Sequence, residues 1–258
     1  MQWQTLFKKE MVGSWRDRKW IWIPLVFILL TIMDPITNYY LPQILETVGG
    51  FPDGAVIEMP TITPIDAIMM SLSQLSSLGV LVIALSSMGI ISSERNSGVA
   101  ELILVKPVSY STYITSKWGA LLFLVWSAYL IGMFAAWYYI GILYAFIPIL
   151  DFLLLLFFYG LWLTLVASLS IFYNAISKTP GLVAFLTIAT LLFMSLATML
   201  LSDNLLWSPN NLSSHIYTML LTGEVPTALY GTGGVTIILS LVLIILATYI
   251  FRKKEHAA

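Results

Sequence analysis

The chain has 258 residues, of which 12 are Lys or Arg and 13 are Asp or Glu, so its net charge is −1 with only 10% charged residues. Apolar residues make up 59%, against about 45–50% in typical soluble proteins, whose charged fraction is about 25%. This balance argues against a soluble enzyme, a disordered chain and a nucleic-acid binder. The sequence instead predicts an integral membrane protein, and because it lacks Cys it has no disulfide or thiolate metal site.

Six apolar stretches are long enough to cross a membrane as helices, since about 30 Å of hydrocarbon needs about 20 mostly apolar residues. We predict an all-α integral membrane protein with one transmembrane domain over 20–251, preceded by a helix at 1–19 and followed by a basic tail at 252–258. The predicted spans are 20–40, 67–92, 118–140, 151–173, 179–202 and 233–251.

The positions of the basic residues support this count. All 12 fall in segments 1–19, 93–117, 174–178 and 252–258, which lie on one side of a six-span protein. Cytoplasmic segments of membrane proteins accumulate Lys and Arg. We therefore expect a multi-pass protein with its N- and C-termini in the cytoplasm.

The first 19 residues are typical of an amphipathic interfacial helix. Lys8, Lys9 and Arg16 lie toward one face, and such a helix rests among lipid headgroups before it enters the first span. Its alternative role is that of a simple basic anchor that orients the protein. The opposite, apolar face carries Trp3, Phe7, Met11 and Trp15.

The loop after the second predicted span has the most informative pattern. Glu94 and Arg95 end the span, and Gly98 can cap a short helix that Pro107 prevents from continuing. This helix could transmit force from a cytosolic partner, or it could rest on lipid headgroups, and the spacing alone favours neither. Its other residues of interest are Val99, Glu101, Leu102, Ile103 and Lys106.

Polar residues inside the predicted spans could serve either helix packing or a polar pathway. Hydroxyl side chains in the second span could pack helices together or line a polar pathway, and packing is the more common role of small residues in membranes. Asp34, Asp66 and Asp151 fall near the predicted outer ends of their spans, which argues against an ion-coupled carrier with a charged midplane site. The hydroxyl residues are Ser71, Ser73, Ser76, Ser77, Ser86 and Ser87.

Outside the membrane, Ser208 and Pro209 mark the start of a further helix, and Gly223 marks its end. The helix either shields the bundle or caps a pathway, and its apolar face comprises Leu212, Ile216, Met219 and Leu220. The chain carries no phosphate-binding loop, no HExxH metal pair and no GxSxG nucleophile motif. We expect no catalytic residue, no metal site and no cofactor in it.

Residues 91–117, ISSERNSGVAELILVKPVSYSTYITSK, resemble the loop that follows the second span in the permeases of ABC-2 type transporters. That family has E-R-x-x-G-T, an apolar stretch, a Pro and a helix ending in Lys, and Val99 stands here where Thr is usual. The matching residues are Glu94, Arg95, Gly98, Leu102, Pro107 and Lys117.

The resemblance implies that 20–251 is a permease domain and that 98–106 is the coupling helix seated on a cytosolic ATPase. The assembly would contain two permeases, identical or different, and two ATPase subunits that bind ATP and Mg²⁺, in a bacterial or archaeal plasma membrane. First and fifth spans commonly meet across the dimer axis in such families, where the pathway forms. Small residues of the fifth span that could contribute a pathway or dimer contact are Gly181, Thr187, Thr190, Ser195 and Thr198.

The leading functional hypothesis is thus a transport subunit that exports a substrate with energy from a separate ATPase, and that is not itself an enzyme. The alternative is a membrane scaffold or sensory subunit that docks the ATPase without transporting anything. An intramembrane enzyme lacks paired catalytic groups, and a secondary carrier lacks a broken midplane helix or an inverted repeat. Fold-level analogy does not name the substrate.

Overall fold

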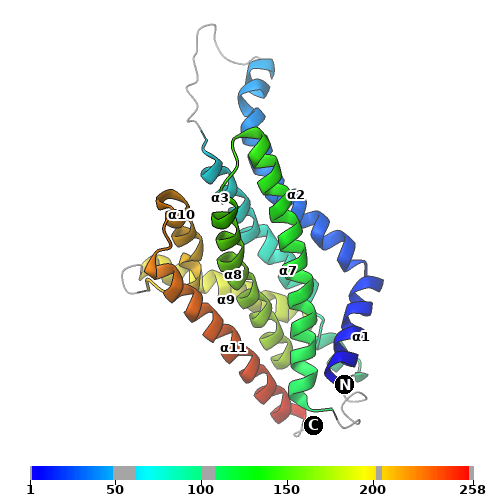
Figure 1. Cartoon of the computed structure of the whole chain (residues 1–258). Coiled ribbons are helices and arrows are strands. Elements are labelled where there is room, and N and C mark those ends of the chain that lie inside the picture. Colours follow the sequence, from blue (N-terminus) through cyan, green and yellow to red (C-terminus); the bar gives the residue numbers. More distant parts are fainter. Residues whose placement is uncertain (1, 49–61, 100–107, 202–204, 256–258) are drawn as a thin grey trace.

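The computed structural model describes residues 2–48, 62–99, 108–201 and 205–255, which form helices and no strand (Figure 1). Six helical stretches are long and apolar enough to cross a membrane, so the predicted all-α fold with six spans is confirmed. Spans one and three to six are α2 (Lys19–Val48), α7 (Tyr110–Leu143), α8 (Ile149–Ile176), α9 (Pro180–Leu200) and α11 (Thr227–Glu255).

The second span is built from four pieces rather than one helix. It comprises α3 (Pro64–Gln74), the π-helical turn η1 (Leu75–Gly79), α4 (Val80–Ser87) and α5 (Ser92–Asn96). Thr63 and Asp66 form a capping box at its start, with each side chain bonded to the other's backbone N–H, which satisfies two otherwise free donors. The extra residue in a π-helical turn bends a helix and widens the local surface, and such turns occur frequently at functional sites.

α7 and α8 form the centre of the bundle, and α2 packs along α7. A side chain at Gly132 of α7 would meet the backbone of Phe27 at 3.1 Å, so glycine allows the two backbones to approach closely. Thr31 donates a hydrogen bond across this contact to the Gly132 carbonyl, at 2.9 Å. The tight seam explains why α2, which is widely exposed elsewhere, stays attached to the centre.

α2 and α7 both extend past the predicted spans 20–40 and 118–140. With 30 and 34 residues, they are about 45 and 51 Å long at 1.5 Å per residue. Their far ends lie above the other helices (Figure 1). Tyr144, next to the end of α7, donates from its hydroxyl to the carbonyl of Pro35 in the middle of α2, at 2.9 Å. The Tyr144 ring also packs edge-on against Tyr39.

The predicted outer helix is present as η2 (Pro209–Asn211) followed by α10 (Leu212–Thr222). It ends at Gly223, which adopts the left-handed conformation at φ 71°, as a C-terminal glycine commonly does. The predicted apolar face is buried in the protein, and its members are Leu212, Ile216, Met219 and Leu220.

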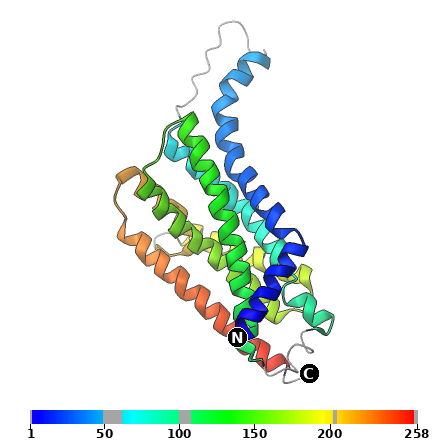
Figure 2. The same ribbon diagram turned by 45° about the vertical axis from the view of Figure 1, so that its right-hand side comes forward.

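The first and last described helices, α1 (Gln2–Arg16) and α11, start and end at the same end of the bundle (Figures 1 and 2). Trp3 donates to the Thr115 hydroxyl at 3.2 Å, and Phe251 stacks on Tyr113, two residues before Thr115 in α7. We call this the basic end, because the described Lys and Arg side chains gather there. The positive-inside rule assigns it to the cytoplasm.

Candidate functional site

At the basic end, a buried lysine joins three helices. Lys117 of α7 is only 2% exposed, and its Nζ lies 2.7 Å from Glu10 Oε1 of α1 and 3.0 Å from Glu94 Oε2 of α5. The same Nζ donates to the Ile90 carbonyl at 2.9 Å. A buried ammonium group tolerates loss of water only when its protons find such partners.

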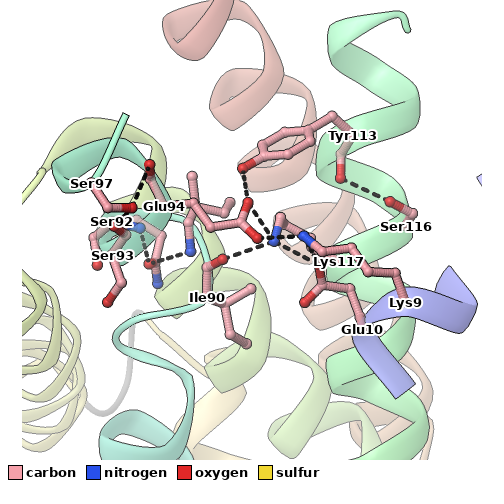
Figure 3. A network of polar contacts seen from close by, with 12 residues as sticks. Lys9, Glu10, Ile90, Ser92, Ser93, Glu94, Ser97, Tyr113, Ser116 and Lys117 are labelled. Carbon is pink, nitrogen blue, oxygen red and sulfur yellow. Dashed lines mark hydrogen bonds and ion pairs between the residues drawn. The ribbon is translucent and has the colours of Figure 1, made fainter. Parts of the chain in front are cut away.

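Two further side chains complete this group, which we call the ionic junction: Lys9, Glu10, Glu94, Tyr113 and Lys117 (Figure 3). Lys9 Nζ lies 2.6 Å from Glu94 Oε1, and the Tyr113 hydroxyl donates to Glu94 Oε2 at 2.6 Å. Burial lowers the pKa of Lys9, but its hydrogen bond to Glu94 and the charges of Glu94 and Glu10 raise that pKa above its ordinary value. The junction is electrically balanced, with two ammonium groups and two carboxylates.

Arg95, the neighbour of Glu94, binds the opposite side of the bundle. It is 7% exposed and donates to the Ala175 carbonyl of α8 at 3.0 Å, with its guanidinium 5.4 Å from the centre of the Phe251 ring in α11. Lys254 donates to the next carbonyl, that of Ile176, at 2.6 Å. Cations at the C-terminus of a helix are favoured by its dipole and by its free carbonyl groups.

Side chains from three other helices hold the interruption between α4 and α5 at residues 88–91. Lys19 of α2 donates to the Ser86 carbonyl, and Asn174 of α8 donates to the Ser87 carbonyl, both at 3.0 Å. Asn174 Oδ1 also accepts from the backbone N–H groups of Ile91 and Ser92, at 3.1 and 3.0 Å. Together with Lys117, these residues supply hydrogen-bond partners for backbone N–H and C=O groups that would pair with each other in a continuous helix.

The structure thus brings the predicted residues Glu94 and Arg95 into a built junction. Gly98 follows α5 with φ +75°, so it is the left-handed residue at the C-terminal end of α5. The sequence predicted it only as the cap of the short helix that follows. Val99, the last described residue before 100–107, is helical. The remaining predicted positions lie outside the described residues: Glu101, Leu102, Ile103, Lys106 and Pro107.

The apolar face of the N-terminal helix contacts protein as well as facing outward. Trp3 stacks on Phe7 with ring centres 5.1 Å apart, and Phe7 contacts Phe123 of α7. Met11 is half-buried, whereas Trp15 is 65% exposed. Half of the predicted interfacial face therefore fastens α1 to the third span.

The predicted small residues of the fifth span divide between internal and surface positions. Thr190 bonds to the Tyr173 hydroxyl and Thr198 to the Ser208 hydroxyl, both at 2.6 Å, and Thr187 is fully buried. Ser195 is exposed, and nothing lies within 4 Å of where a Gly181 side chain would stand. Only Gly181 and Ser195 therefore remain available for a partner.

A groove of about 610 Å³ runs between α3–α4, α9 and the η2–α10 segment. We call it the serine groove, because hydroxyl groups of the π-helical region of the second span open into it. Trp162 also lines it, is 8% exposed, and its indole N–H has no hydrogen-bond partner among the described residues. The serines of the groove are Ser73, Ser76, Ser77, Ser195 and Ser213.

The six hydroxyl residues of the second span therefore split between the two roles that the sequence left open. Ser71 bonds to the Thr31 carbonyl and Ser87 to the Ser170 hydroxyl, both at 2.6 Å, so these serines pack helices together. Ser73 and Ser77 are exposed toward the groove instead, and Ser76 both lines the groove and bonds to the Tyr159 hydroxyl of α8 at 2.8 Å. Ser86 is buried and bonds to the Ile83 carbonyl of its own helix. The π-helical turn, which no local sequence pattern marks, decides which serines face outward.

No family model matches the chain. It is similar to an "Uncharacterized transmembrane protein YxlG" of Bacillus subtilis (strain 168), with 28% identity over 251 residues that cover 97% of both chains. In the ranges that the structure describes, no three His, Asp or Glu side chains gather closely enough to hold a metal ion. The six apolar helices and this relative together make the chain a transmembrane protein.

Proposed function

We propose that the chain is the permease subunit of an ABC-2 type transporter in the cell membrane. Two permease copies, the same or different, would assemble with two cytosolic ATPase subunits that supply the ATP and Mg²⁺ sites. ATP-driven motion of the ATPases would move the loop at 98–107 and, through it, rearrange the spans. The direction of transport that we propose is export.

The observation that carries this proposal is the anchoring of Glu94 and Arg95. Glu94 is bonded to α1 and α7, and Arg95 is bonded to α8 and packs on α11. These two residues stand immediately before the loop that the family resemblance assigns to ATPase docking. A displacement of this loop would therefore act directly on four helices.

The serine groove supports transport rather than scaffolding alone. Its volume lies within the range of about 300–1,000 Å³ typical of ligand sites, and it combines an apolar lining with a few polar groups. Ser73 and Ser77 open into this groove within a membrane span, and a scaffold has no need for exposed hydroxyl groups there. They are suitable hydrogen-bonding groups for a cargo molecule.

The first test is purification of the tagged chain from its native membranes, where a cytosolic P-loop ATPase is expected to accompany it. Gly98→Pro and Pro107→Leu are expected to lower ATP hydrolysis by the complex at least about tenfold, because they alter the loop between the spans and the ATPase. Gly234→Ala is the control, because open space surrounds that position in α11. Unchanged hydrolysis in both loop variants would contradict the coupling role.

A second measurement separates the transporter from the scaffold. Complexes reconstituted in liposomes are supplied with ATP and a mixture of amphiphiles extracted from the native membrane, and the contents are analysed before and after hydrolysis. A transporter enriches at least one compound across the membrane, whereas a scaffold enriches none.

A further inference from the structure

Asp34 lies inside the hydrocarbon region, at about the depth that the predicted span 20–40 gives it. It follows Lys19 by 15 residues in α2, which corresponds to about 22 Å along the helix. The second span gives a similar depth independently. Lys19 bonds to Ser86 and Asp34 bonds to Gln74, and these two partners are 12 residues apart in the second span. That separation corresponds to about 18 Å along the span. With Lys19 at the boundary of about 30 Å of hydrocarbon, Asp34 lies inside the outer half of the bilayer.

The other two outer acidic residues are not comparable. Asp66 caps the first turn of α3, and Asp151 stands in the first turn of α8, where acidic residues are favoured by the helix dipole. Asp34 stands in the middle of a 30-residue helix. It therefore has no capping role that would account for a carboxylate at this depth.

Asp34 is only partly satisfied by its surroundings. Gln74 Nε2 donates to Asp34 Oδ2 at 2.7 Å, whereas Oδ1 receives no hydrogen bond from any residue that the structure describes. The side chain is half-buried rather than enclosed. Charged residues within a membrane span are rare and mark substrate or ion pathways.

The chain offers no counter-ion for this carboxylate. All basic residues belong to the segments 1–19, 93–117, 174–178 and 252–258, and the described ion pairs lie at the basic end. A second copy with the same orientation in the membrane has the same distribution. A positive charge for Asp34 must therefore come from outside the permease.

The surroundings suit a positively charged group attached to an apolar body. Exposed hydroxyl groups of Ser73 and Ser77 flank Gln74 in the second span. Apolar residues of α2, among them Met33, form the rest of this surface.

We propose that the Asp34 carboxylate binds the positively charged group of an amphiphilic substrate in the outer half of the membrane. This inference rests on the proposed transport function and names the class of its cargo. Gln74 holds the carboxylate toward the second span, and the negative charge at Oδ1 attracts the ammonium, guanidinium or phosphonium group of the ligand. The substrate's apolar part lies along the exposed faces of α2 and the second span.

The test uses the full chain in lipid nanodiscs, without the ATPase, and two probes of the same shape and opposite charge. Tetraphenylphosphonium and tetraphenylborate are titrated by equilibrium dialysis, with binding to empty nanodiscs subtracted. We expect saturable binding of the cation that Asp34→Asn weakens about tenfold or more, with no loss for the anion. Absence of saturable cation binding, or an unchanged affinity in Asp34→Asn, would overturn the inference.

Two further variants separate charge from structure. Asp34→Asn keeps an oxygen that accepts the Gln74 hydrogen bond but removes the charge, whereas Asp34→Glu keeps the charge and is expected to retain most of the cation affinity. Asp151→Asn removes one negative charge elsewhere and is expected to bind both probes as the original protein does. A loss in either variant equal to that of Asp34→Asn would assign Asp34 a structural role and overturn the inference.

The result is independent of the proposed ATPase coupling. If cation binding depends on Asp34 but the chain recruits no ATPase, the binding site is supported and the transporter proposal is contradicted. If the Asp34→Asn complex hydrolyses ATP normally and its cation affinity is also unchanged, the transporter proposal is supported and the binding site is contradicted.

Discussion

The polar groups of this protein have different surroundings at two levels of the second span. At its basic end, described polar side chains such as those of Glu94 and Arg95 are paired with other helices. Twenty residues earlier, around the π-helical turn, Ser73 and Ser77 are exposed, and the carboxylate of Asp34 in the neighbouring α2 has one oxygen free of partners among the described residues. Both regions carry polar groups in an apolar protein, but the first encloses them between helices and the second leaves part of them exposed.

The difference follows from what each region must do. A junction that transmits displacement has to be rigid, and buried ionic groups are fixed by their partners because separating them leaves an uncompensated charge. A region that binds a changing ligand has to leave hydrogen-bonding capacity free. The comparison predicts that substitutions at the ionic junction lower stability strongly, whereas the same substitutions beside the serine groove lower it little.

The largest effect is expected for Lys117→Met. This change leaves Glu10 and Glu94 without their shared ammonium group, and removing one partner of a buried ion pair costs about 3–5 kcal/mol. The loss is measured as a fall in the thermal unfolding midpoint, followed by circular dichroism in detergent micelles. Lys8→Met is the matched control, because Lys8 is exposed on the adjacent helix and surface changes usually stay within about 0.5 kcal/mol.

If Lys117→Met and Lys8→Met lower the midpoint equally, the ionic junction is not a stabilising element, and the distinction between the two regions fails. Lys117→Arg is expected to retain part of the stability, because a guanidinium keeps the charge but does not fit the geometry of a single ammonium.

A smaller effect is expected when each region loses an asparagine. Asn174→Leu removes the partners of the Ile91 and Ser92 N–H groups and of the Ser87 carbonyl, and each unsatisfied buried group costs about 1–3 kcal/mol. We expect a total loss of about 3 kcal/mol, measured by the same unfolding assay. Asn210→Leu, beside the serine groove, breaks one long contact of 3.4 Å to Thr198 and is expected to cost less than about 1 kcal/mol. Equal losses would contradict the comparison.

The sequence predicted the bundle well because hydropathy and charge asymmetry act over whole helices. Six apolar stretches, the clustering of Lys and Arg, and the Gly223 stop each reflect a local physical requirement. The same reasoning identified Glu94 and Arg95 through the resemblance of their loop. It did not predict that α1 would fasten to α7 through Trp3 and Phe7, since amphipathicity does not say whether an apolar face meets lipid or protein.

The partners of the ionic junction were not predictable for a different reason. Lys117 was predicted only as a basic flank of the third span and as the Lys that ends the family's loop, and Asn174 only as part of a loop, yet each bonds to residues far away in the chain. The sequence also gives no signal that α2 continues to Val48. The length of α2 and its register against the second span are set by tertiary packing, which single-sequence patterns do not contain.

The smallest and most specific test compares two serines in the second span. Ser87 and Ser77 each bond to a carbonyl four residues earlier, at 2.6 and 3.0 Å, but only Ser87 also bonds to another helix, through the Ser170 hydroxyl at 2.6 Å. Ser87→Ala is expected to cost about 0.6–1.7 kcal/mol, the range of interhelical hydrogen bonds in membranes. Ser77→Ala is expected to leave stability unchanged or slightly raised, since Ala favours helix more than Ser does.

Ser170→Ala alone and combined with Ser87→Ala completes a double-mutant cycle that isolates the bond between the two hydroxyls. A coupling energy near zero would mean that Ser87 is as free as Ser77, and that the serines of this helix are not divided by the π-helical turn. A coupling near 1 kcal/mol, with Ser77→Ala neutral, would place the boundary between packing and pathway hydroxyls inside a single span. That boundary is the physical difference on which the proposed coupling and binding roles depend.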